Sequence, residues 1–220
     1  MKKNRGFLIL LILMSLIGQS CERKLKDIGS FYKWINDPEN GMVKSASAGG
    51  VKVTLKYLPP EYLVYQQIEE EGMKGSKIDS LLNAQKYSKV FLMTIGPAET
   101  GSGDIMYKEL DNYKQYKERV LQMNFDMASY LEIHAGTSIY KPMLSTMENT
   151  YSTSESRNIY MVFIDDKKQK GDLINAKELE LVFQDELFQS GINHFVFNKK
   201  EMDHLPEMEF LTGLKNQTIK

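Results

Sequence analysis

The sequence contains very little cysteine and histidine. Its single cysteine, Cys21, cannot form an internal disulfide, so packing alone must hold the folded chain together. The three histidines, His134, His194 and His204, are dispersed and show neither the HxxxH nor the HExxH spacing of zinc sites. We therefore predict that the protein holds no metal ion and no cofactor.

The chain also lacks the short motifs that mark common catalytic sites. It has no GxSxG motif, and the loop GPAETGSG at Gly96–Gly103 lacks the lysine and hydroxyl residue that complete a Walker loop. We interpret this loop as a connector, with an anion held by its amides as the alternative. Asp165 and Asp166 could offer oxygens to a hard cation, but the surrounding DDKKQKGD is typical of a solvated hairpin turn. We predict no catalytic residue.

An excess of basic residues is absent as well. Three of the 28 basic residues and none of the 29 acidic ones precede Cys21, so the chain from Cys21 onwards has a net charge of −4. A general nucleic-acid-binding protein would carry a basic excess. We therefore expect no nucleic-acid partner.

The N-terminus has the organisation of an export signal. A basic segment comes first, and an apolar run follows over residues 7–17, interrupted only by Ser15. Small and polar residues, Gly18 to Ser20, then lead to Cys21. This order is typical of a secretory signal peptide, and the run is far shorter than the roughly 20 apolar residues of a membrane-spanning helix. We predict that residues 1–20 are a signal peptide.

The segment LIGQSC, which ends at Cys21, resembles the lipobox of bacterial lipoproteins. The resemblance implies that signal peptidase II cuts after Ser20 and that Cys21 carries a diacylglyceryl thioether. Two or more acyl chains hold a protein stably on a membrane. Gly18 stands where the family usually has leucine, and two alternatives stay open: ordinary signal peptidase would release a soluble protein, and Cys21 could be a free thiol.

The location of the protein follows from the same resemblance. It implies a bacterial cell, with the protein attached to an envelope membrane through its lipid. Glu22 follows the cysteine, whereas the aspartate that often signals inner-membrane retention is not present. We therefore expect an outer-membrane protein that faces the periplasm, joined to its anchor by a short tether over residues 21–27.

Hydrophobic periodicity predicts a single α+β domain over residues 28–220. We expect an antiparallel sheet of about six strands, with one long helix and shorter helices packed against it. A hairpin is predicted around the turn 48–50, with its second strand over 51–57, and a strand covered on both faces is predicted over 89–95. A final meander is predicted from the strands 159–164, 179–188 and 195–198. The predicted helices end at glycines or polar turns: 28–35, 62–72, about 78–82 and the long helix 105–133, which places His134 at a helix C-terminus.

Two classes of function agree with these features. The first is a non-enzymatic envelope lipoprotein that serves as an accessory or anchoring subunit of a protein assembly. Its possible partner contacts are Met147 and Tyr151, in the polar stretch Ser145–Asn158 that we expect to form a loop. The second is a lipid-anchored periplasmic hydrolase or ligand-binding protein whose site is assembled from residues scattered along the chain.

Overall fold

The protein is an α+β structure built on two antiparallel sheets. The computed structural model describes residues 24–72, 75–149, 154–165 and 171–216. A five-stranded sheet has the order β1-β2-β3-β7-β6, and a four-stranded sheet has the order β5-β4-β8-β9. The strands are β1 Val43–Ala48, β2 Val51–Leu58, β3 Ser88–Pro97, β4 Leu131–Ala135, β5 Ser138–Tyr140, β6 Leu144–Met147, β7 Arg157–Ile164, β8 Glu178–Asp185 and β9 Gly191–Asn198.

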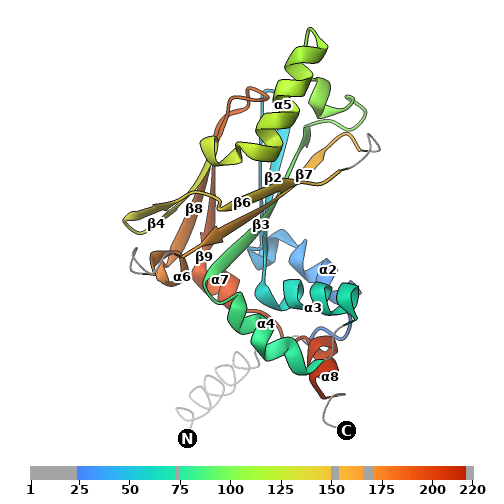
Figure 1. Ribbon diagram of the computed structural model, residues 1–220, viewed down its shortest axis with the longest axis vertical. Coiled ribbons are helices and arrows are strands. Elements are labelled where there is room, and N and C mark those ends of the chain that lie inside the picture. Colours follow the sequence, from blue (N-terminus) through green and yellow to red (C-terminus); the bar gives the residue numbers. More distant parts are fainter. Residues whose placement is uncertain (1–23, 73–74, 150–153, 166–170, 217–220) are drawn as a thin grey trace, which may run out of the picture.

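The helices gather at the two ends of these sheets. Figure 1 shows α2, α3, α4 and α8 at the lower end and α5 at the opposite end. The described α-helices are α2 Ile28–Ile35, α3 Pro60–Glu71, α4 Ile78–Ala84, α5 Tyr113–Phe125, α6 Asp172–Asn175, α7 Lys199–Asp203 and α8 Glu209–Asn216. None of the helices in these ranges is long and apolar enough to cross a membrane.

The predicted hairpin forms β1 and β2. Gly49 and Gly50 both have positive φ angles, 59° and 74°, as a two-residue turn of this kind requires. A side chain on Gly49 would also lie 3.0 Å from the carbonyl oxygen of Gln189, in the loop between β8 and β9. The glycine therefore allows the turn of one sheet to approach the loop of the other.

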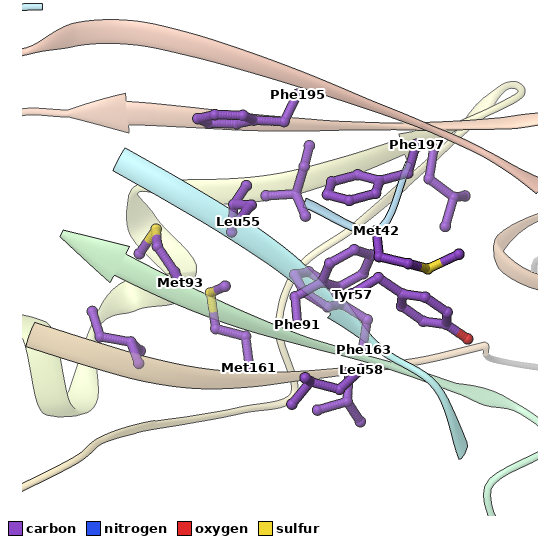
Figure 2. Packing of buried hydrophobic residues seen from close by; sticks show 14 of the residues in the cluster. Met42, Leu55, Tyr57, Leu58, Phe91, Met93, Met161, Phe163, Phe195 and Phe197 are labelled. Carbon is purple, nitrogen blue, oxygen red and sulfur yellow. The ribbon is translucent and has the colours of Figure 1, made fainter. Parts of the chain in front are cut away.

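The core lies between the two sheets. The predicted alternation on β2 is confirmed, because Val51, Val53, Leu55 and Tyr57 are all buried. Figure 2 shows aromatic side chains of β9 facing those of β2 and β3, and the ring centroids of Phe91 and Phe197 are 5.1 Å apart. Since aromatic rings bury large apolar areas, this contact joins the two sheets into one hydrophobic core.

The predicted long helix over residues 105–133 is wrong. Only the middle of that span is α-helical, as α5, and β4 begins at Leu131. Asn112 caps α5 by accepting a hydrogen bond from the amide of Gln115, and Glu109 before it has a positive φ of 51°. The apolar spacing continues through the span because the elements around α5 also bury apolar residues. A 3-10 turn before α5 buries Met106, and a 3-10 turn and a strand after it bury Met127 and Leu131.

The predicted meander of the last three strands is confirmed for β8 and β9, which pair antiparallel, and is wrong for β7. The strands exist, but β7 belongs to the five-stranded sheet and β8 pairs with β9 in the other sheet. β7 has no free edge to offer β8, because β3 and β6 pair with its two sides. The single sheet of about six strands is therefore replaced by two sheets.

The packed body begins close to the predicted lipid anchor. Leu25 is buried and forms a parallel bridge with Met208, which precedes α8. Its amide donates to the carbonyl of Glu207 at 2.8 Å, and its carbonyl accepts from the amide of Glu209 at 2.9 Å. These bonds place residue 25 inside the folded structure, three residues before the domain boundary expected from the sequence.

Candidate functional site

Of the residues predicted to contact membrane or partner, Met147 alone lies within the described structure. Cys21 and Tyr151 fall outside the described residues. Met147 is the last residue of β6, lies opposite Ile159 of β7 and packs partly against the core. Strands form both ends of the stretch 145–158, because β6 extends to Met147 and β7 begins at Arg157.

The glycine-rich loop after β3 already holds an anion from its own chain. The amides of Gly101 and Gly103 donate to the carboxylate of Glu155, at 3.0 and 3.3 Å. Asp104, directly after the loop, forms an ion pair with the buried Arg157 of β7. The amides that could have cradled a ligand therefore fasten the loop to the start of β7.

Asp165 is not part of a solvated turn. It is buried, and it accepts hydrogen bonds from the hydroxyl of Tyr140 and the amide of Ile174, each at 3.3 Å. These bonds connect the end of β7 to β5 and α6. Its role is to join three elements, while Asp166 lies outside the described residues.

Two histidines come together on the outer surface of the four-stranded sheet. His134 lies on β4 rather than at a helix C-terminus, and its Nε2 is 2.7 Å from the carboxylate of Glu132. Glu180 of β8 bridges the two imidazoles, with its Oε1 at 2.9 Å from Nδ1 of His194 and its Oε2 at 3.8 Å from Nδ1 of His134. The described residues contain no group of three or more side chains placed to hold a metal ion. His204 is exposed after α7.

A polar cleft of about 280 Å³ lies beside α5. The buried Arg119 lines it and donates to the carbonyls of Met106, Lys108 and Leu187. Burial lowers the pKa of this guanidinium, although Asp185 and Glu109 oppose that shift. Arg119 is thus committed to three carbonyls, and its role is to hold α5 against two loops.

A second cavity, of about 130 Å³, lies where α2 and α3 cross the outer face of the five-stranded sheet. We name it the Lys56 pocket, and its lining residues are Phe31, Tyr32, Ile35, Lys56, Leu58, Tyr62, Leu92 and Tyr160. Strand register builds the floor, because Lys56 of β2 pairs with Leu92 of β3, and Leu92 pairs with Tyr160 of β7. The three side chains therefore lie in one row across the sheet.

Two helices build the wall of this pocket. The ring of Phe31 on α2 stacks on that of Tyr62 on α3, with the centroids 5.1 Å apart. The hydroxyls of Tyr32 and Tyr62 are 3.1 Å apart and share a hydrogen bond. Phe31 and Tyr62 are buried, whereas Tyr32 is 44% exposed and opens to solvent. The wall is thus aromatic, with phenol groups at its rim.

Lys56 is the charged residue of the pocket. The Lys56 side chain is half-buried in the cavity, and this burial lowers the pKa of its ammonium group. Burial likewise raises the pKa of the Tyr62 phenol, which its hydrogen bond with Tyr32 raises further. Within the described part of the chain, the Lys56 ammonium has neither a hydrogen bond nor an ion pair. The lining of the pocket therefore carries one positive charge among apolar and phenol groups, while Glu70, outside the lining, acts electrostatically on the phenols of Tyr62 and Tyr160.

Sequence reasoning did not find this pocket. Alternation on β2 placed Lys52, Thr54 and Lys56 together on a face expected to be half exposed. The cover provided by α2 and α3 divides that face: Leu58 is buried, Lys56 is half-buried and Lys52 is exposed. The only signal in the sequence was a lysine two residues from the apolar end of the strand.

No family model matches the chain, and no curated protein matches it. Among solved structures, the chain is similar to a novel protein of unknown function from Burkholderia pseudomallei, with a TM-score of 0.35 and 11% sequence identity. That match covers 80% of this chain and 89% of the other. The proposals below therefore rest on the residues of this chain.

Proposed function

We propose that the protein is a lipid-anchored lipoprotein of a bacterial envelope and acts as a non-enzymatic accessory or anchoring subunit of an envelope protein assembly. One observation carries the anchor: three residues separate the only cysteine from the end of a basic and then apolar N-terminal segment, in a sequence that resembles a lipobox. The anchor would be Cys21, on the periplasmic face of the outer membrane.

The start of the packed body supports a close attachment. Leu25 is buried, and Lys24 forms an ion pair with Glu207 at 2.8 Å. At about 3.5 Å per residue, the link from Cys21 to Lys24 spans about 10 Å at most. The end of the molecule that carries α8 would therefore lie against the lipid headgroups.

A non-enzymatic role is supported by the surroundings of the candidate catalytic groups. The imidazoles of His134 and His194 have glutamates as their hydrogen-bond partners among the described residues, whereas an acyl-transfer site would pair one with a nucleophile. Met147 and Tyr151 remain our candidates for contact with an envelope protein. The Lys56 pocket favours a second function, the binding of a small ligand.

The anchor is tested by substituting Cys21 with serine in cells fed labelled fatty acid. We expect Cys21→Ser to accumulate as an unprocessed precursor without label, because serine offers no thiol for lipid transfer. Ser20→Ala is the matched control, since alanine keeps a small residue before the cut and should preserve labelling. Normal maturation and labelling of Cys21→Ser would refute the proposal.

A further inference from the structure

We propose that the Lys56 pocket binds a small organic carboxylate with an aromatic or branched apolar body. The carboxylate would pair with the Lys56 ammonium, and the apolar body would lie over Leu92 between the sheet and α2. This ligand class goes beyond the proposed lipoprotein function and does not depend on the anchor.

The charge of the pocket selects the ligand's head group. Partly burying an ammonium group without a partner is unfavourable, and a bound anion offsets part of that cost by forming a charge-assisted hydrogen bond. The lining contains one cation and no acidic side chain. A carboxylate carries one negative charge and matches it, whereas a phosphate near −2 would keep an unpaired charge beside apolar walls.

The apolar walls select the body of the ligand. Phe31, Ile35 and Leu58 line the pocket, and each is at most 3% exposed, so packing holds these side chains in place. The cavity of about 130 Å³ is close to the roughly 150 Å³ of an engineered protein cavity that accepts benzene. The part of a ligand held inside the pocket is therefore about the size of a single ring or a branched aliphatic chain.

The row across the sheet sets the direction in which the ligand lies. Neighbouring strands are about 4.8 Å apart, so Lys56 on β2 and Tyr160 on β7 stand about 10 Å apart, with Leu92 between them. A carboxylate at Lys56 directs the apolar body over Leu92 towards the Tyr160 ring. Tyr160 is 37% exposed, so the open side of the pocket lies at that end of the row.

The only tryptophan of the chain provides the assay. Trp34 is 7% exposed on α2, and its ring centroid is 6.4 Å from that of Phe31, which lines the pocket. Phenylacetate serves as the probe, titrated into the mature protein while Trp34 emission is recorded, with calorimetry as a second measurement. Phenylacetamide is the neutral control of nearly the same shape.

The variants are Lys56→Met and Lys52→Met. Methionine keeps an unbranched apolar side chain at either position, and Lys52 lies on the same face of β2 outside the pocket. We expect saturable binding of phenylacetate, weakened about tenfold or more by Lys56→Met and unchanged by Lys52→Met. Phenylacetamide should bind wild-type protein about tenfold more weakly than phenylacetate, a comparison that needs no variant.

Three results would overturn the proposal. They are the absence of saturable phenylacetate binding, equal weakening by both lysine substitutions, and equal affinity for phenylacetate and phenylacetamide. The last result would show that the pocket selects apolar shape without using the charge of Lys56.

Discussion

Replacing Arg119 with methionine should destabilise the protein by releasing α5 from two loops. Arg119 is 9% exposed, and its guanidinium donates to the carbonyls of Met106 at 3.1 Å and of Lys108 and Leu187 at 2.8 Å. It also lies 4.7 Å from the centroid of the Phe188 ring. Methionine keeps much of the apolar stem but leaves these three carbonyls without their donor.

The size of the effect follows from opposing contributions. A hydrogen bond to a charged group contributes about 1.5–3 kcal/mol, and the contact with an aromatic ring contributes about 1 kcal/mol. The methionine variant recovers part of this lost free energy of unfolding, because it no longer buries a cation. The burial of the cation is unfavourable, which is also why the pKa of Arg119 is lowered. We therefore expect a net loss of about 2–3 kcal/mol in the free energy of unfolding.

Urea denaturation of wild type and variant measures this difference, with hydrogen exchange at the Leu187 amide as a local readout. Lys117→Met is the matched control, because Lys117 is exposed on the same helix and should change stability by less than about 0.5 kcal/mol. If Arg119→Met stays within about 0.5 kcal/mol of wild type, or if both variants lose the same amount, Arg119 does not hold α5 in place.

Two further predictions concern Glu155 and Lys56. Glu155→Gln should speed hydrogen exchange at the amides of Gly101 and Gly103, because it weakens their acceptor, and should lower the free energy of unfolding by less than about 1 kcal/mol. Unchanged exchange at both amides would contradict the anchoring of the glycine-rich loop by Glu155. Burial lowers the pKa of Lys56 in the folded protein below its ordinary value of 10.5. Between the folded pKa and 10.5, the unfolded chain therefore binds more protons than the folded chain does. The stability of the wild-type protein should consequently rise as the pH rises through this range towards 10.5. Lys56→Met should therefore be more stable than wild type near neutral pH and lose that advantage in alkaline solution. Urea denaturation midpoints measure the difference, with Lys52→Met as the control. A stability advantage of Lys56→Met that does not change with pH would contradict this assignment.

Local patterns in the sequence predicted many of the elements correctly. The alternation from Val51 to Tyr57, the Gly49-Gly50 turn and the helix over residues 28–35 are all present in the structure. Each depends on a few neighbouring residues, such as Asp27, which caps α2 by accepting from the amide of Ser30 at 2.7 Å. Such features need no knowledge of the rest of the chain.

Spacing alone failed where different elements bury residues with the same rhythm. Met106, Met123, Met127 and Leu131 continue one apolar pattern, but they belong to a 3-10 turn, a helix, another 3-10 turn and a strand. Strand pairing failed for a related reason. Nothing in residues 159–198 shows that β7 is already paired on both edges, which sends β8 and β9 to a second sheet.

The sequence by itself determined the proposed anchor, because a processing signal is read from consecutive residues around Cys21 before the chain folds. Only the tertiary structure decided the Lys56 pocket. Its lining comes from α2, β2, α3, β3 and β7, which lie up to about 130 residues apart in the chain. Lys52 and Lys56 have the same place in the strand pattern, yet α2 and α3 cover one and leave the other in solvent. Burial without an ion pair depends on that packing, and it is this physical difference that makes Lys56 a candidate binding residue.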